Sequence, residues 1–146
     1  MQIHINLDSK VEETTIQVSC NKLTPEIEKL MATLRMLDKK LLVKREDETY
    51  ILDVGKILYM EAIDRKTFVY TISDIYESPL RLYELEEQLE DYGFYRVSKS
   101  CILQLRNIES LKADFDRRIR VTMENGEKII VSRQYADGLK KKLGVR

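Results

Sequence analysis

From residue 41 to residue 131 the chain is a succession of short apolar segments of strand length, separated by polar turns. The expected strands are 41–43, 50–54, 57–62, 67–72, 94–97, 101–103, 108–111, 118–123 and 128–131. Short segments of this kind, bounded by turn residues, are typical of strands in a sheet. Asn125-Gly126, between the last two segments, is the strongest short-range hairpin signal. The pattern predicts a mostly β domain over residues 41–146.

Two helical segments interrupt this series. Leu82, Leu85 and Leu89 recur at helical spacing with glutamates between them, which predicts a short amphipathic helix. Ser132 precedes a last helix that ends near Lys142. The fold class is therefore mainly β with short helices (α+β).

The first forty residues predict a small β-β-α extension. Residues 1–7 and 15–19 alternate between apolar and polar side chains with period two, as strands do. Thr24-Pro25-Glu26 is a helix start, with a capping hydroxyl, a proline and an acid in the first turn. A unit of this size is too small to be stable alone. We expect residues 1–40 to mediate a homodimer, to act as a regulatory element, or to pack on their own domain.

The overall composition places the chain among ordinary globular proteins. Its 146 residues are 43% hydrophobic, which is enough for one packed core. No apolar run approaches the roughly 20 residues of a membrane helix. The first residues read as a strand rather than a signal peptide, so we expect a cytoplasmic protein. In that compartment Cys20 and Cys101 are expected to be reduced, buried thiols.

The net charge of zero is an average over two unlike halves. Residues 1–94 hold 12 basic and 19 acidic side chains, a net charge of −7. Residues 95–146 hold 13 basic and 6 acidic side chains, a net charge of +7. Such a division indicates a polyanion-binding end on an acidic scaffold, although uneven surface decoration would give the same totals.

Catalysis has little support in the sequence. The single histidine, His4, lies on an expected strand, where a solvent-facing role outweighs a role as base or metal ligand. The sequence holds neither a Cys/His cluster, nor a glycine-rich phosphate loop, nor a nucleophile elbow. We therefore expect no enzyme activity, no cofactor and no metal site.

Arg133 is the most informative single side chain. It follows the expected cap Ser132, where a positive charge opposes the helix dipole. From that position an arginine can give two hydrogen bonds to a guanine edge in the major groove. An exposed arginine without a role is the alternative.

Other polar side chains lie at strand ends and in turns. Gln104 ends an apolar strand and has the donor and acceptor that adenine requires, although it also suits a polar strand face. Ser98, Lys99 and Ser100 form a polar turn suited to phosphate contacts. Arg65 and Lys66 form a second such turn. Arg118 and Arg120 share one strand face, which is more consistent with a solvated surface.

An ordered series of segments resembles the LytTR DNA-binding domain of bacterial response regulators. The segments are Ile57–Glu61, Arg65–Tyr70, Leu82–Glu86 with Leu89, Phe94–Ser100, Asn107-Ile108, Asn125–Glu127, Val131–Tyr135 and Leu139-Lys140. The series runs in order across roughly residues 41–146. Departures from the family pattern are Ser98 in place of a common histidine, Gln104 in place of asparagine, and Arg81 in place of a small capping residue.

The resemblance implies an elongated arrangement of antiparallel strands that reads the major groove through loops, at paired direct repeats. It implies base-reading positions at Arg65, Lys66 and Thr67, at Gln104 and at Arg133. Backbone contacts are implied at Ser98, Lys99 and Ser100. The receiver domain usual in the family is missing, so the chain resembles the stand-alone LytTR regulators. In that group, activity is often set by expression level or by a membrane-protein partner.

These observations predict a transcriptional regulator that binds double-stranded DNA as a homodimer. The alternative is a protein-interaction module that docks a partner through the acidic N-terminal half.

Overall fold

The computed structural model describes residues 1–145, which contain three α-helices, ten strands and five short 3-10 turns. The α-helices are α1 (Pro25–Arg35), α2 (Leu82–Gln88) and α3 (Arg133–Leu143). The first five strands are β1 (Lys40–Arg45), β2 (Glu48–Asp53), β3 (Tyr59–Ile63), β4 (Lys66–Tyr70) and β5 (Ile75–Ser78). The others are β6 (Phe94–Ser98), β7 (Cys101–Gln104), β8 (Ile108–Ala113), β9 (Ile119–Met123) and β10 (Lys128–Val131). The expected α+β class is confirmed.

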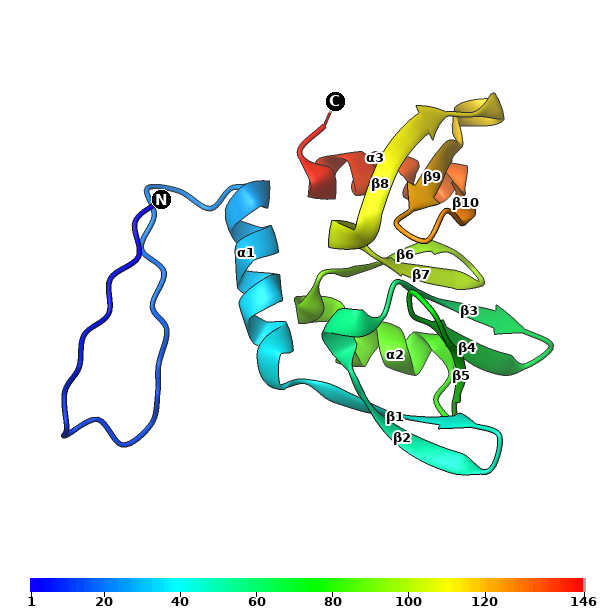
Figure 1. Ribbon diagram of the computed structural model, residues 1–146. Helices are drawn as coiled ribbons and strands as arrows, with labels where there is room; N and C mark the ends of the chain where they lie inside the picture. The colour runs from blue at the N-terminus through cyan, green and yellow to red at the C-terminus, as the bar shows by residue number, and fades with distance from the viewer. Residues whose placement is uncertain (146) are drawn as a thin grey trace.

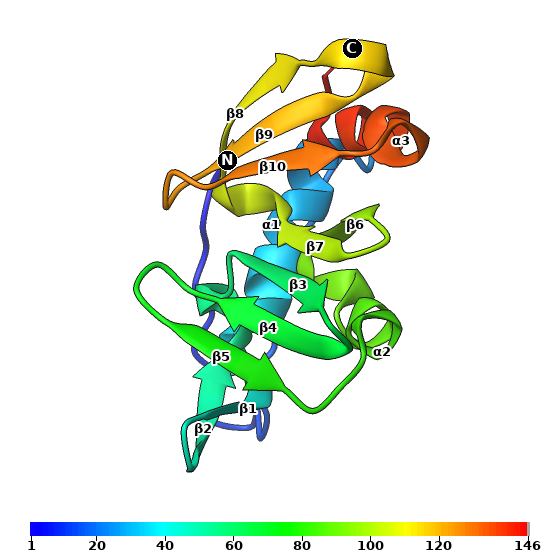
Figure 2. The ribbon, with the colours of Figure 1, turned by 90° about the vertical axis from the view of Figure 1, so that its right-hand side faces the viewer.

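All strand pairs are antiparallel and fall into two sheets. The larger sheet has the order β2-β1-β5-β4-β3-β7-β6, and the smaller one β10-β9-β8. Figure 2 shows the strands following one another along the length of an elongated molecule. The central strand β3 pairs with β4 on one side and with β7 on the other.

Two hydrophobic cores hold this arrangement together. The first lies between the larger sheet and α2, where Leu85 and Leu89 are fully buried with Met60 and Ile102. The second joins β6 and β7 to the smaller sheet and α3. Alternation along β7 serves both cores, because Ile102 faces the first while Cys101 and Leu103 face the second.

The two cysteines have different environments. Cys101 is buried, and burial raises the pKa of its thiol to about 12, so it packs as a neutral core group. Cys20 is exposed, which corrects the expectation that both thiols are buried.

Most expected strands are confirmed within a few residues, and one strand was missed. The four residues of β5 carry Glu77 and Ser78, and they give too short a pattern to separate from a loop. The segment becomes a strand because it inserts between β1 and β4, with Val69 opposite Tyr76 and Lys44 opposite Glu77.

The two N-terminal strands are not formed. Residues 1–7 and 15–19 are extended but have no ladder partner, and their apolar side chains are largely exposed. The helical part of the extension is confirmed as α1, with Thr24 accepting a hydrogen bond from the backbone of Ile27 at 3.3 Å. The expected β-β-α unit is therefore a helix preceded by an unpaired segment, which stands apart from the sheets in Figure 1. Alternation favours a strand, but a strand requires a neighbour to accept its backbone hydrogen bonds.

Among residues 1–145, no helix has the length and hydropathy needed to cross a membrane.

Candidate nucleic-acid interface

The turn between β3 and β4 presents two charged residues in a strained conformation. Ile63 pairs with Lys66, which leaves Asp64 and Arg65 as a two-residue turn. Both have positive φ, 49° and 69°, as hairpin turns of this length require. A non-glycine residue in the left-handed region costs roughly 1–2 kcal/mol. The chain thus keeps an exposed arginine where the backbone alone would favour glycine.

Arg96 stabilises the turn between β6 and β7 through hydrogen bonds to its backbone. Ser98 pairs with Cys101, so Lys99 and Ser100 form the exposed turn. Arg96 donates to the carbonyl oxygens of Ser98 at 2.7 Å and Lys99 at 2.5 Å, and forms an ion pair with Glu86 at 2.9 Å. Arg96 thus stabilises the backbone of this turn, on which Lys99 is exposed.

The β6–β7 hairpin is joined to β3 and to the start of α3 by backbone hydrogen bonds. The N–H of Ala62, near the end of β3, donates to the Ser100 carbonyl at 2.8 Å. The N–H of Ser132, at the start of α3, donates to the Val97 carbonyl at 2.9 Å. Figures 1 and 2 both show the β3–β4 turn, the β6–β7 turn and the start of α3 along one side of the molecule. We call these three segments the turn face.

Arg133 is the first residue of α3, as expected, and its side chain is 64% exposed. One guanidinium nitrogen lies 3.4 Å from a carboxylate oxygen of Asp116, in the loop between β8 and β9. Ser132 occupies the cap position, but its hydroxyl donates to the Val97 carbonyl at 3.3 Å instead of capping the helix. The amide groups at the start of α3 therefore have no side-chain cap.

A shallow depression of about 400 Å³ joins these elements. Its lining comes from the β6–β7 turn, the β8–β9 loop and the start of α3. The lining residues are Lys99, Asp116, Arg118, Ser132, Arg133, Gln134 and Tyr135. Lys99 and Arg133, which are 34 positions apart in the sequence, thus border the same hollow.

The β8–β9 loop is the part of this surface that sequence reasoning missed. Asp116 and Arg117 have positive φ, 58° and 62°, and Phe115 is 85% exposed. Arg118 was expected on a solvated strand face, yet it lines the depression beside Arg133. Only the folding of this loop against α3 shows the connection, and no local sequence pattern encodes it.

Gln104 does not lie on this surface, which corrects its expected position in the reading site. It is fully buried, and its amide nitrogen donates to the carbonyl oxygens of Ile57 at 2.5 Å and Val54 at 3.4 Å. Gln104 pairs with Phe94, a residue of the first core, and the Gln104 side chain points toward that core. Its amide oxygen is buried without a hydrogen-bond partner. Gln104 thus tethers the segment before β3.

The remaining expected residues divide between surface and interior. Arg65, Lys66, Lys99 and Ser100 are exposed, and Ser98 is half-buried. Lys66 lies 3.8 Å from the Glu77 carboxylate on β5. Thr67 is only 5% exposed, so its side chain supports the turn from inside instead of contacting a ligand.

Comparison with known families identifies the family of the domain that carries this surface. Residues 47–144 match the LytTR family, the LytTr DNA-binding domain. The chain belongs to the LytTR family. The match begins near the start of β2 and ends just after α3, so it contains the whole turn face.

A solved LytTR structure shares the fold. It is described as the LytTr DNA-binding domain of a methyl-accepting/DNA response regulator from Bacillus cereus. Its sequence is 29% identical, the TM-score is 0.69, and the superposition covers 73% of this chain and 98% of that one.

Two relatives from Staphylococcus aureus, strains MSSA476 and MW2, are similar over the full chain. Each is 26% identical over 147 residues, covers 99% of both proteins, and is named an uncharacterized HTH-type transcriptional regulator. The LytTR fold described here has no helix-turn-helix within residues 1–145. Five strands separate α1 from α2, and five more separate α2 from α3, whereas that motif joins two consecutive helices by a short turn.

The buried position of Gln104 generates the first prediction. Gln104→Met removes the donor to the Ile57 carbonyl, whereas the Val54 carbonyl keeps its hydrogen bond from the Ile57 N–H. We expect a loss of about 1–3 kcal/mol in the free energy of urea unfolding. DNA affinity should be unchanged at a temperature where the variant is folded. A Gln104→Met protein of normal stability that binds DNA poorly would return Gln104 to the reading site.

Proposed function

We propose that this LytTR protein is a bacterial transcriptional regulator that binds double-stranded DNA sequence-specifically through the turn face. The observation that carries the proposal is the joining of three distant segments by two backbone hydrogen bonds, Ala62 to Ser100 and Ser132 to Val97. These bonds fix Arg65, Lys99 and Arg133 relative to one another before any ligand binds. A preformed reading surface of this kind avoids the cost of ordering loops on binding.

Arg133 is proposed to read a base. Its guanidinium group is exposed at the rim of the depression, and the fork of N–H donors matches the two acceptors of a guanine edge. Asp116 uses one nitrogen of that group, and the ion pair restricts the rotamers of the arginine. Asp116 is thus a positioning residue, because it orients Arg133 without occupying the whole fork.

Lys99, Ser98 and Ser100 are proposed to hold the DNA backbone. A lysine on a fixed turn is a point charge suited to phosphate, and serine hydroxyls add hydrogen bonds to phosphate oxygens. Lys66 and the buried Thr67 support Arg65 in the neighbouring turn. Arg118 joins this group, since it lines the same depression as Lys99. Gln104 is left out because its side chain is buried.

Major-groove reading at paired direct repeats and regulation through a membrane-protein partner rest on the family resemblance and remain part of the proposal. A homodimer and a cytoplasmic location are also part of it. Selection of bound fragments from random duplex DNA tests the arrangement of the half-sites. Two copies of one motif in the same orientation are expected, and a single unpaired motif would contradict paired binding.

The second prediction separates base reading from phosphate contact. Arg133→Ala should weaken binding to a selected site by roughly 5–150-fold and relax discrimination at one base position. Lys99→Ala should weaken binding to all sequences and reduce the slope of log affinity against log salt by about one. Fluorescence anisotropy over a salt series measures both effects.

Lys44→Ala, in β1 and away from the turn face, is the control and should behave as wild type. Equal effects of Arg133→Ala on selected and random DNA would remove Arg133 from base reading. Absence of salt-sensitive DNA affinity in the wild-type protein would favour the alternative of a protein-interaction module.

The third prediction uses the strained β3–β4 turn. Arg65→Gly should stabilise the protein by about 0.5–1 kcal/mol, because relief of left-handed strain exceeds the added chain entropy of glycine. The same change should lower DNA affinity, since the exposed arginine is lost. Urea unfolding and anisotropy on one preparation measure the two effects.

Glu46→Gly is the matched control. Glu46 also has a positive φ of 58°, but it lies in the β1–β2 turn, away from the turn face in Figure 2. It should gain stability with unchanged DNA affinity. If the two glycine variants bind DNA equally well, Arg65 has no part in binding.

A further inference from the structure

The first 23 residues form an N-terminal arm whose apolar side chains are largely exposed. A backbone hydrogen bond from Val11 to Asp8, at 3.1 Å, turns the chain back on itself. Figure 1 shows two extended legs on the far side of α1 from the sheets. The arm thus follows the path of a β-hairpin, but its two legs form no ladder of backbone hydrogen bonds.

Alternation gives each leg of the arm an apolar side. Ile3, Ile5 and Leu7 recur at every second residue and are 82%, 84% and 91% exposed. On the returning leg, Ile16 is 62% exposed and shares its side with Val18. Successive side chains of an extended chain point to opposite faces, so these residues form a one-sided apolar surface. An isolated two-stranded hairpin of this kind is marginally stable at best in water.

Helix α1 has a second apolar surface outside the two cores, which is half-buried at Ile27, Leu30 and Leu34 and exposed at Leu37. Ile27, Leu30, Leu34 and Leu37 follow one another at intervals of three or four residues and therefore share one face. Ala32, the buried residue of α1, lies on the opposite face. The four residues belong to neither hydrophobic core, and Leu37 is 66% exposed. We call them the outer stripe of α1.

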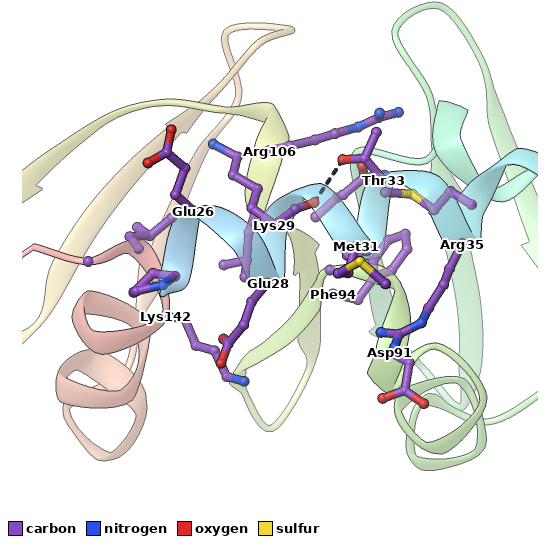
Figure 3. A pocket seen from close by; sticks show the side chains of 18 of the residues that line it. Glu26, Glu28, Lys29, Met31, Thr33, Arg35, Asp91, Phe94, Arg106 and Lys142 are labelled. Carbon is purple, nitrogen blue, oxygen red and sulfur yellow. Dashed lines mark hydrogen bonds between the residues drawn. The ribbon is translucent and has the colours of Figure 1, made fainter. Parts of the chain in front are cut away.

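The inner side of α1 buries Ala32 against the domain and also borders a groove. A groove of about 670 Å³ runs between α1, the segment before β6 and the end of α3. Figure 3 shows Met31 and Phe94 in the middle of this groove, with charged side chains such as Glu28, Arg35 and Asp91 around them. The outer stripe does not line the groove. The groove and the outer stripe are therefore different surfaces.

We propose that the N-terminal arms of two copies of this chain pair into one four-stranded antiparallel sheet. This sheet packs on the outer stripes of both α1 helices and closes a homodimer. Pairing supplies the backbone partners that each arm lacks alone, and four strands packed on helices meet the usual requirement for a stable sheet. A stable interface takes roughly 20–30 residues a side, which the arm and α1 can supply.

A second copy suits this surface better than a partner of high charge. The arm carries three acidic residues, Asp8, Glu12 and Glu13, against the two lysines Lys10 and Lys22. Two such arms repel each other only weakly. The Staphylococcus aureus relatives cover 99% of this chain and of their own length, so the similarity extends over the arm, although the family match begins only at residue 47.

Multi-angle light scattering of the full chain without DNA tests the proposal. The wild-type protein is expected to be a dimer at micromolar concentration. Ile5→Lys, on the apolar side of the arm, and Leu34→Lys, on the outer stripe, should each weaken dimerisation at least tenfold. Asn6→Lys adds the same charge one residue away, on the polar side of the arm, and should leave the dimer intact.

Ile5 is exposed and Leu34 is half-buried outside both hydrophobic cores, so thermal unfolding should show that the domain remains folded in all variants. A monomeric wild-type protein would overturn the proposal. A dimer that survives both Ile5→Lys and Leu34→Lys, or is lost equally in Asn6→Lys, would overturn it as well. Because the assay contains no DNA, its outcome is independent of the proposed DNA binding.

Discussion

The structure depends on the position of β3 between β4 and β7. Pairing with β4 forms the hairpin that carries Arg65, and pairing with β7 brings in the hairpin that carries Lys99. The hydrogen bond from Ala62 to Ser100 extends the second pairing to the edge of both turns. The two hydrophobic cores meet at β7, so each half of the molecule holds the other in place. A change that loosened β3 would separate the turns that we propose to contact DNA.

The turn face and the adjoining β8–β9 loop contain residues whose backbone conformation or charge is locally unfavourable. Asp64, Arg65, Asp116 and Arg117 all adopt the left-handed conformation without being glycine. Arg133 places a positive charge at the start of a helix, where the dipole disfavours it. Each of these features costs stability and lies along one side of the molecule, whereas Glu46, which also has a positive φ, lies in the β1–β2 turn. Strain that gathers in this way is characteristic of functional surfaces.

The sequence predicted the features that local chemistry controls. Leucine spacing located α2. Arg81 replaces the small capping residue common in the family, and Glu84 compensates for it, because its carboxylate accepts a hydrogen bond from the Arg81 N–H at 3.1 Å. Asn125-Gly126 located the last hairpin, where Gly126 has a φ of 86°. The position of Arg133 at a helix start followed from Ser132. These features depend on neighbours within a few residues.

The errors arose where distant parts of the chain decide the outcome. Gln104 looked available for a base, but the carbonyl groups of Val54 and Ile57, about fifty residues away, bind its amide. The strand β5 exists because β1 and β4 flank it, and the arm has no strands because nothing flanks it. The basic loop at Arg118 joined the turn face only through its contact with α3. Local sequence patterns contain no information about these contacts between distant segments.

The central claim is that the β3–β4 turn, the β6–β7 turn and the start of α3, joined by the fold, form a single DNA-binding side. Titration of the isotope-labelled protein with a selected duplex, followed through backbone amide chemical shifts, tests it directly. The claim predicts the largest shifts around Arg65, Lys99 and Arg133 together, with little change in the β1–β2 turn at Glu46. Large shifts confined to the β1–β2 turn or to α2, with the turn face unaffected, would contradict it.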